Sequence, residues 1–438
     1  MGILKLPRVR LYWSRMFRVD LVAQAMPRNR FFELRSYVHF VDKLSITPNE
    51  REENRLVLVK PILTSFRNAC LELPRSRDVS IDEQMIPFSG RCPVRQCVPS
   101  KPNPVGLKNF VMASPDGLVL DFAIYVGKGT VSVEDMREFG LGGSIIKKLV
   151  ATLKRDQHTF LFTDRYFTDM KIAEHLVDEN IFLTGTVMAN RTGGVAAAMP
   201  QDRDMKRGDS HCKVRSDRKM CLVKWKDNKS VLVLSTGSFL LVQRQMQRWS
   251  KDKKKKVKVP QPHAVAEYNQ FMGGVDLIDR FVSYYRISMR TKKWTVRVFA
   301  QFLDIACCNG WIEYKRLCEQ SATPKQQRLD LLTFKMDIAI ALIKAETSPR
   351  SKRLRETEAD SDDEEVNARG KKRGKVTALP PDDVRYDLTG HFPEHQMLGS
   401  HNRCRNPGCS GKSRVKCLKC GIFLCLQNRN CFLKFHTR

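Results

Sequence analysis

The order of apolar segments between residues 78 and 187 constrains the fold more than any other feature of the sequence. Strand-like and helix-like patterns follow one another as β-β-β-α-β-α-β, in the segments DVSIDEQM, LKNFVMA, LVLDFAIYVG, GGSIIKKLVATLKR, HTFLFTD, TDMKIAEHLVDEN and IFLTGTV. The turn sequence Ser114-Pro115-Asp116-Gly117 joins the second and third segments as a hairpin. Antiparallel strands extended by parallel strands through helical crossovers predict an α/β, ribonuclease-H-like domain, although a flavodoxin-like variant fits the same periodicity.

The charge of the chain points to an acidic partner. The 438 residues include 77 Lys and Arg against 47 Asp and Glu, a formal net charge of +30. So large a positive charge indicates a polyanionic partner. No stretch reaches the ~18 consecutive apolar residues of a membrane span, and arginines interrupt the opening segment where a signal peptide would be apolar. We therefore expect a soluble protein that is not secreted.

Three aspartates stand where ordinary packing does not require them. Asp82 interrupts the first strand, Asp164 ends the strand HTFLFTD, and Asp276 follows a Gly-Gly pair at the start of an amphipathic helix, with Asp279 one turn further on. Each has a plain structural explanation, because Asp caps helices and is favoured by the helix dipole. In a ribonuclease-H-like sheet, however, the first and fourth strands are neighbours and a later helix packs across them. We therefore expect the three carboxylates to converge.

Converging carboxylates repel one another unless a cation neutralises them. Hard divalent cations such as Mg²⁺ or Mn²⁺ suit such a site, and two of them about 4 Å apart activate a hydroxyl and stabilise the leaving oxygen in phosphoryl transfer. The sequence has no GxxxxGK[ST] phosphate loop, which argues against nucleotide hydrolysis. The pattern therefore indicates metal-dependent phosphodiester cleavage and strand transfer.

Seven Cys and His side chains crowd the end of the chain, in the pattern Cys404-x4-Cys409-x7-Cys417-x2-Cys420-x4-Cys425-x5-Cys431-x4-His436. Because one tetrahedral Zn²⁺ takes four ligands, this number indicates two ions in an interleaved arrangement. An eighth ligand is then needed, and His391, His395 and His401 are the candidates. A disulfide knot is the alternative, but so short a segment with few apolar residues is more readily folded by metal.

Four motifs make the sequence resemble the piggyBac transposases and the piggyBac transposable element-derived proteins. They are SIDEQMIPFSGR (80–91), PSKPNPVGLKNFV (99–111), FTDRYFTD (162–169) and YNQFMGGVDLIDR (268–280). The opening GILKLP and the segment RNRFFELRSYVHF also fit, so the resemblance covers nearly the whole chain. Two features differ from the family. The long acidic segment that usually precedes GILKLP is absent, and Arg280 stands where many relatives have Gln.

The resemblance implies an activity and assigns residues to it. Asp82, Asp164 and Asp276 fall on the family's catalytic Asp triad, and Asp279 falls on a further acidic position near the Mg²⁺ or Mn²⁺ site. It implies cut-and-paste transposition at TTAA sites through hairpin intermediates, by a nuclear homodimer that binds the terminal inverted repeats of double-stranded DNA. By the family's H-x-P element, it also favours His391 as the eighth Zn²⁺ ligand.

A domesticated descendant that binds DNA or chromatin without complete transposition is the alternative to an active transposase. We expect that part of the amino-terminal region is missing, which counts against complete transposition, whereas the intact Asp triad argues against simple decay. A zinc-dependent ubiquitin ligase would explain the Cys and His residues but would leave the carboxylates without a role.

Several basic residues are candidates for contact with DNA phosphates, because each neutralised phosphate releases counterions. They are Arg91, Lys101, Lys108, Arg290, Lys292 and Lys293. Trp294, beside the last two, either stacks on an unpaired base or anchors the following helix. The run KDKKKKVK at 251–258 is either a solvated loop or a segment for nuclear import or DNA-backbone contact.

These features divide the chain into six regions. We expect a helical dimerisation and DNA-binding region (1–77), the first part of the ribonuclease-H-like catalytic core (78–187), a β-rich insertion domain (188–262), the second part of the core with a helical region (263–345), a charged disordered linker (346–385) and a cysteine-rich zinc-binding domain (386–438). The linker is expected because RSKRLR, ETEADSDDEE and KKRGK alternate blocks of like charge, which do not pack.

Overall fold

The computed structural model describes residues 2–99, 101–237, 243–250, 254–344, 379–380, 382–387, 390–396, 400–427 and 429–437. They belong to two compact units, one within residues 1–362 and the other within 363–438. Over these ranges, no helix is long and apolar enough to cross a lipid bilayer.

A mixed sheet forms the centre of the first unit. Its order is β2-β3-β1-β5-β6-β9-β8-β7, and β4 also pairs with β3. The strands are β1 (Asp78–Pro87), β2 (Arg95–Cys97), β3 (Val105–Ala113), β4 (Val119–Ile124), β5 (Thr159–Thr163), β6 (Ile181–Thr186), β7 (Ser210–Val214), β8 (Cys221–Lys226) and β9 (Ser230–Ser235). The pairs β1–β5 and β5–β6 are parallel, and the β1–β3 and β3–β4 pairs are antiparallel. This is the predicted ribonuclease-H-like order, with the short strand β2 in addition.

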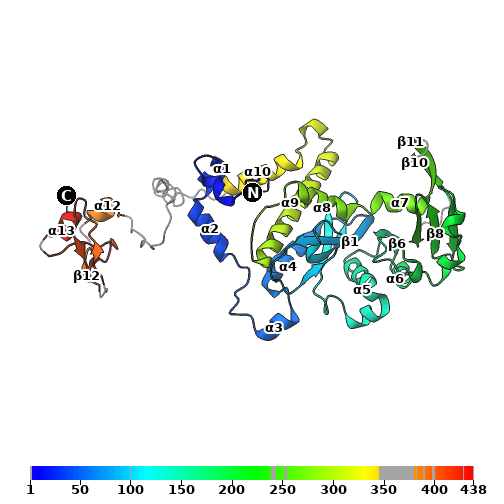
Figure 1. Cartoon of the computed structure of the whole chain (residues 1–438), viewed down its shortest axis with the longest axis horizontal. Helices are drawn as coiled ribbons and strands as arrows, with labels where there is room; N and C mark the ends of the chain where they lie inside the picture. Colours follow the sequence, from blue (N-terminus) through cyan, green and yellow to red (C-terminus); the bar gives the residue numbers. More distant parts are fainter. Residues whose placement is uncertain are drawn as a thin grey trace. The chain divides into compact units, whose positions relative to one another are not determined.

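Helices cover both faces of this sheet (Figure 1). On one face, α5 (Val133–Val150) and α6 (Met170–Val177) pack against Val79 and Ile81 of β1. On the other face, α4 (Lys60–Glu72), α8 (Gly274–Tyr284) and α9 (Trp294–Gln320) pack against Ile86 and its neighbours. Successive side chains of a strand point to opposite faces, so the apolar residues of β1 supply both cores.

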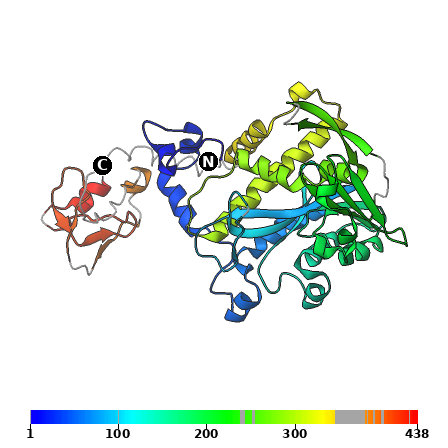
Figure 2. The same ribbon diagram turned by 45° about the vertical axis from the view of Figure 1, so that its right-hand side comes forward.

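The β-rich segment after β6 extends the central sheet. β9 pairs antiparallel with β6, and β8 and β7 follow it outward. Beyond them, β10 (Gln243–Ser250) and β11 (Lys255–Pro262) form a two-stranded ribbon that leads into α7 (His263–Phe271) (Figure 2).

The ribbon corrects the loop interpretation of the basic run for residues 255–258. Residues 251–253 lie outside the described residues, and from Lys255 the run is strand β11. Lysines and valines alternate there, so Val259 is buried while Lys256 and Lys258 are exposed. This alternation is typical of a strand with one covered face.

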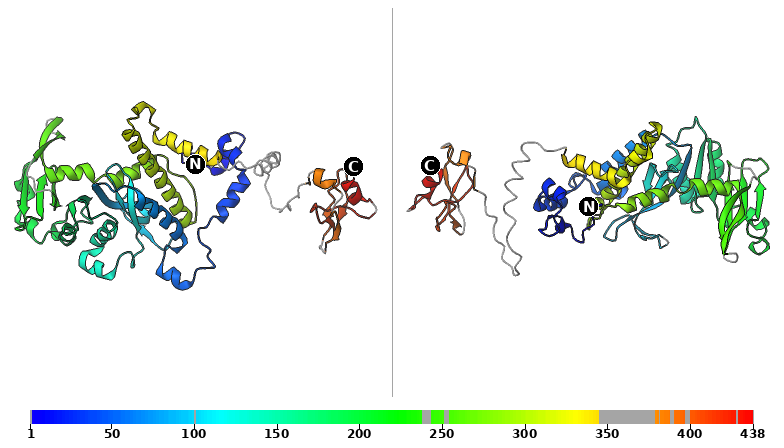
Figure 3. Two further views of the ribbon diagram at one scale, coloured as in Figure 1. Left: turned by 180° about the vertical axis from the view of Figure 1, so that it is seen from behind. Right: turned by 90° about the horizontal axis from the view of Figure 1, so that it is seen from above.

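Short helices precede the sheet, and a helical hairpin follows it. The first are η1 (Val9–Trp13), α1 (Asp20–Ala25), α2 (Arg28–Tyr37), α3 (Pro48–Glu53) and η2 (Val57–Val59). Thr47 and Glu50 begin α3 with a reciprocal capping box. α9 and α10 (Leu331–Lys344) pack against each other, with the ring of Tyr314 5.5 Å from that of Phe334 (Figure 3). The remaining 3-10 turns are η3 (Ala189–Arg191), η4 (Val195–Ala198), η5 (Asp202–Asp204) and η6 (Lys325–Gln327).

The second unit is small and built from short elements. They are α12 (Asp382–Arg385), β12 (Pro393–His395), β13 (Asn402–Arg403), β14 (Lys412–Ser413), β15 (Val415–Cys417) and α13 (Cys431–His436). The guanidinium of Arg385 lies 3.9 Å from the ring centroid of Phe435. Most of the predicted linker at 346–385 lies outside the described residues, but α12 at its end is ordered against this unit.

Candidate active site and metal centres

Asp82 and Asp164 lie at matching positions of two neighbouring parallel strands. The register of β1 and β5 ends at the pair Ile81–Thr163, and the next residue of each chain segment is the aspartate. Side chains at matching positions of adjacent parallel strands point to the same face of a sheet. The two carboxylates therefore share the face on which α8 packs.

Helix α8 brings Asp276 to this face. Its first residue, Gly274, approaches the sheet so closely that an added Cβ would lie 2.4 Å from the carbonyl oxygen of Ser114 and 2.8 Å from Oγ of Ser80. Only glycine fits there, whereas a Cβ on Gly273 would have nothing within 4 Å. The close approach at Gly274 sets the helix against the sheet two residues before Asp276, which is itself exposed.

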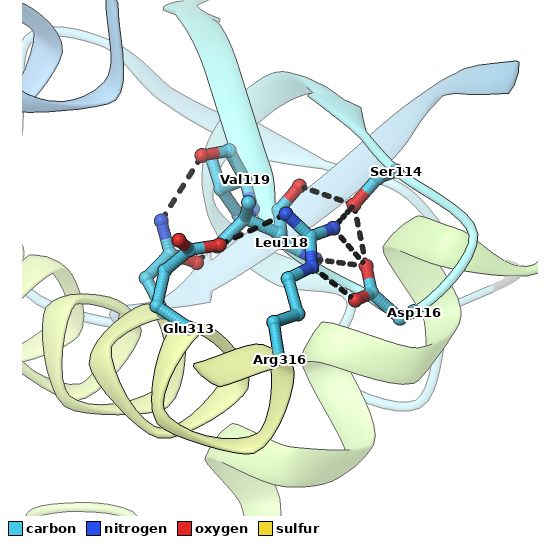
Figure 4. Close-up of polar contacts among 7 residues, drawn as sticks. Ser114, Asp116, Leu118, Val119, Glu313 and Arg316 are labelled. Atoms are coloured by element: carbon cyan, nitrogen blue, oxygen red, sulfur yellow. Dashed lines mark hydrogen bonds and ion pairs between the residues drawn. The ribbon is translucent and has the colours of Figure 1, made fainter. Parts of the chain in front are cut away.

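An arginine of α9 fixes the turn on which α8 rests. Arg316 donates from Nε and Nη2 to the two carboxylate oxygens of Asp116, both at 2.9 Å, and from Nη2 to Oγ of Ser114 at 3.1 Å (Figure 4). Nearby, the side-chain amide of Asn309 pairs with the backbone N–H and C=O of Val119, both at 3.0 Å. These contacts attach α9 to the β3–β4 turn, and that turn supports the start of α8.

Asp279 is held by a chain of buried amides. Nε2 of Gln84 donates to Oδ1 of Asp279 at 2.6 Å, and Nδ2 of Asn109 donates to Oε1 of Gln84 at 3.3 Å. Both amides are fully buried and face each other in the β1–β3 register. Sequence reasoning did not single them out. The available signal was the spacing of Ser80, Asp82 and Gln84, which puts three polar side chains on one face of a buried strand.

The carboxylates oppose one another's ionisation. Burial, together with the nearby charges of Asp164 and Asp276, raises the pKa of Asp82 to about 7. Burial also raises the pKa of Asp164 and lifts the pKa of Asp279 to about 6. A site of this kind favours either bound protons or a bound cation.

The donor chemistry of this site fits a hard divalent cation, because carboxylate oxygens are the ligands that Mg²⁺ and Mn²⁺ prefer. The ligand atoms themselves are not gathered. Within the described ranges, the groups of three or more Cys, His, Asp or Glu atoms that lie within 4.8 Å of one another all belong to the cysteine-rich unit. Asp82 and Asp164 each accept a backbone N–H bond, at 2.7 and 2.9 Å. The structure thus places Asp82 and Asp164 on one face of the sheet, and the charges of Asp164 and Asp276 act on Asp82. That the carboxylates bind a common cation stays a prediction.

Two predicted DNA contacts, Lys101 and Lys108, lie beside Glu83 at the edge of this site. Nζ of Lys108 is 2.7 Å from the Glu83 carboxylate and 4.3 Å from the ring centroid of Tyr166, and only 12% of its side chain is exposed. Nζ of Lys101 is 3.6 Å from the same carboxylate and its side chain is 27% exposed. Lys101 therefore has more surface to offer a phosphate than Lys108, whose ammonium is held within the protein.

The other predicted basic DNA contacts lie at the surface. Arg91, Arg290, Lys292 and Lys293 are all exposed, and Lys293 also makes a contact within the protein. Lys293 donates to the carbonyl oxygen of Ser36 at 2.5 Å, in the last turn of α2. A cation is favoured at a helix carboxyl end, so Lys293 docks the segment before α9 onto α2.

Trp294 is an apolar anchor of α9. It is 9% exposed and belongs to the apolar cluster that contains Val298 and Phe302. This position matches the interpretation of Trp294 as the anchor of the following helix. Stacking on a base would require the ring to leave this cluster.

Eight of the Cys and His residues of the second unit form two separate groups, to which His395 and His401 do not belong. The first is Cys404, Cys409, Cys425 and Cys431, and the second is His391, Cys417, Cys420 and His436, with the ligand atoms of each group within 4.8 Å of one another. The pairs alternate between the groups along the chain, which is the predicted cross-braced arrangement. Four sulfurs, or two sulfurs and two imidazoles, are donor sets that fit tetrahedral Zn²⁺.

The histidines of the second group are oriented by neighbouring polar groups. Nδ1 of His391 lies 3.3 Å from Sγ of Cys420, while its Nε2 lies 3.0 Å from Oδ1 of Asp387. Nε2 of His436 also lies 3.3 Å from Sγ of Cys420, while its Nδ1 lies 2.7 Å from the carbonyl oxygen of Phe432. Partners of this kind fix which imidazole nitrogen is available to a metal.

Comparison with known proteins decides the family. The family model described as Transposase IS4 matches residues 1–311, which is most of the chain. The chain belongs to this family, in its piggyBac-type branch. The resemblance inferred from the four motifs is thus confirmed. The Transposase IS4 match includes all four aspartates of the candidate active site and ends before the cysteine-rich unit.

Two human proteins and one solved structure illustrate the relationship. PiggyBac transposable element-derived protein 3 of Homo sapiens is 27% identical over 446 residues, covering 100% of this chain and 68% of that protein. PiggyBac transposable element-derived protein 2 of Homo sapiens is 28% identical over 405 residues, covering 90% of this chain and 62% of that protein. The cryo-EM structure of a piggyBac transposase synaptic complex with hairpin DNA matches with a TM-score of 0.67 at 22% identity, covering 98% of this chain and 84% of that one. This structural match shows that the fold is shared.

Proposed function

We propose that this protein is a piggyBac-like DNA transposase that performs metal-dependent phosphodiester cleavage and strand transfer. The proposed reaction is cut-and-paste transposition at TTAA sites through hairpin intermediates. The proposal is supported by the matching positions of Asp82 and Asp164 on β1 and β5. It is also supported by the charges of Asp164 and Asp276, which raise the pKa of Asp82. The proposal extends to a nuclear homodimer that binds the terminal inverted repeats of double-stranded DNA.

The candidate site suggests a role for each of its side chains. Asp82, Asp164 and Asp276, with Asp279 beside them, would hold Mg²⁺ or Mn²⁺, which supplies Lewis acidity to the attacking and leaving oxygens when bound. The amide of Gln84 fixes the direction of the Asp279 carboxylate. A phosphate entering this acidic site needs a neighbouring cation, and the partly exposed Lys101 is suited to provide it.

The cysteine-rich unit would bind two Zn²⁺ ions, one in each group of four ligands. Its apolar core contains few residues besides the cysteines, chiefly Ile422, Leu424, Phe432 and Phe435. So small a core supplies little folding free energy, and structural Zn²⁺ supplies it in domains of this size. By analogy with the family, the folded unit would recognise the terminal repeats.

The test of the proposal is DNA cleavage by the full chain. A linear DNA that carries the inverted repeats found beside the gene, bordered by TTAA, is incubated with the protein and Mg²⁺. Nicks and hairpins are expected from the wild type. Asp82→Asn, Asp164→Asn and Asp276→Asn should each abolish cleavage and retain DNA binding, while Asp178→Asn, at an exposed position after α6, serves as the matched control. Normal cleavage by all three variants would refute the assigned site.

A domesticated DNA-binding descendant is the second candidate function. Both human relatives are named as transposable element-derived proteins, and the carboxylates of the described residues are not gathered into a ligand group. This candidate predicts salt-sensitive DNA binding with no Mg²⁺-dependent product in the same assay.

A further inference from the structure

Helix α7 lies next to the candidate active site and carries a tyrosine toward it. The helix packs on β6 and β1. Phe271, near its end, contacts Phe162 of β5 with ring centroids 5.2 Å apart. Tyr268 is three residues earlier and therefore on the same face of the helix. The side chain of Thr186, at the end of β6, lies near enough to the Tyr268 hydroxyl to lower the pKa of that hydroxyl through hydrogen bonding.

Thr186 belongs to the same row of side chains as two of the aspartates. The registers of β1–β5 and β5–β6 place Asp82, Asp164 and Thr186 side by side across three parallel strands. All three side chains point to the face that α7 and α8 cover. Tyr268 thus lies next to Thr186, at the β6 end of this row. Helix α8 lies at the other end, next to β1.

The surroundings of Tyr268 keep its hydroxyl protonated. Burial raises the pKa of Tyr268 above its ordinary value, and the charges of Asp164, Asp82 and Asp276 raise it further. A phenol in such surroundings donates a hydrogen bond at neutral pH and does not act as a base. The partner that such a donor stabilises is an anionic oxygen brought into the site.

We propose that Tyr268 is a further catalytic residue of this protein, whose hydroxyl donates a hydrogen bond to a non-bridging oxygen of the scissile phosphate. The inference rests on the proposed function, because the scissile phosphate is the one cleaved in that reaction. The bond gains strength as charge develops on the phosphoryl oxygens in the transition state. Thr186 is a positioning residue that holds the hydroxyl at the end of β6.

The first arm of the test measures single-turnover cleavage in Mg²⁺. Tyr268→Phe keeps the ring and removes the hydroxyl, and it should slow cleavage about 10- to 100-fold, the loss expected for one hydrogen bond to a charged group. Tyr284→Phe, at a tyrosine of α8 that is 50% exposed, is the matched control and should cut at the wild-type rate. Thr186→Val should show a smaller loss that Thr186→Ser restores.

The second arm measures DNA affinity in Ca²⁺ and needs no turnover. The substrates carry either a normal phosphate or a methylphosphonate, which lacks one anionic oxygen, at the scissile position. Tyr268→Phe should weaken binding of the phosphate substrate about tenfold and leave binding of the methylphosphonate substrate nearly unchanged. A merely structural tyrosine would weaken both substrates equally, and that result would overturn the inference.

The two arms separate this inference from the proposed function. If the wild type fails to cut DNA but the substrate-dependent loss of affinity is found, the transposase activity fails and the phosphate contact stands. If the wild type cuts and Tyr268→Phe cuts at the same rate with the same affinities, the inference fails and the transposase proposal stands.

Discussion

Replacement of Asp82 by Asn should stabilise the protein while it abolishes cleavage. The carboxylate of Asp82 is largely withdrawn from water beside two further acidic groups, and its pKa is raised to about 7. An ionised Asp82 therefore opposes folding at neutral pH in metal-free buffer. Asn has the same shape, and its carbonyl oxygen can still accept the Glu83 N–H bond of 2.7 Å. It removes only the charge.

The size and the pH dependence of this effect follow from the pKa. An ordinary Asp has a pKa near 3.9, and each tenfold change in proton affinity is worth about 1.4 kcal/mol. A folded-state pKa of about 7 thus corresponds to a cost of about 4 kcal/mol above pH 7. As the pH falls from about 7 to 4, the folded state binds its proton first and the cost declines. Below about pH 4 both states are protonated and the cost vanishes.

Urea denaturation in EDTA at pH 4, 5.5 and 8 measures this difference directly. The free energy of unfolding of Asp82→Asn should exceed that of the wild type by about 4 kcal/mol at pH 8 and by nearly nothing at pH 4. Replacement of EDTA by Mg²⁺ should reduce the difference at pH 8, because a cation that binds ionised Asp82 stabilises the wild type. Asp178→Asn should show no such trend. A difference that is the same at every pH would refute the electrostatic argument.

Three further predictions concern the helix start, a buried ion pair and the metal centres. Gly274→Ala should lower the free energy of unfolding by about 1–3 kcal/mol through overpacking and should impair cleavage, whereas Gly273→Ala should be tolerated because its Cβ meets open space. Lys335→Met should cost about 3–5 kcal/mol in denaturant unfolding, because Nζ of Lys335 lies 2.7 Å from Asp304 and their side chains are 9% and 1% exposed. Metal analysis of the full chain should find about two Zn²⁺ per molecule, and Cys420→Ser should reduce this to about one.

Each of these predictions has an outcome that contradicts it. Equal stability of the two Ala variants would show that the contact of α8 with Ser114 does not set the helix. A Lys335→Met variant as stable as Lys325→Met, at an exposed position, would show that the ion pair is not needed. Loss of both ions in Cys420→Ser with an intact fold would contradict two independent centres.

The sequence alone determined the features that depend on local conformation and spacing. The alternation of strand and helix periods gave the order of the core, and Ser114-Pro115-Asp116-Gly117 marked the β3–β4 turn. The spacing of Cys and His residues gave the interleaved pairs. Such patterns can be read from the chain because backbone conformation and the side-chain repeat are set by residues a few positions apart.

Only the tertiary structure decided the features that depend on distances between remote residues. It brought His391 to Cys420, buried Trp294 among apolar side chains, and engaged Lys293 with the end of α2. It also continued the central sheet into β9, β8 and β7 and raised the pKa of Asp82. The sequence does not show whether a basic or aromatic residue is exposed or buried. Burial and electrostatic coupling depend on which residues the folded chain places beside it.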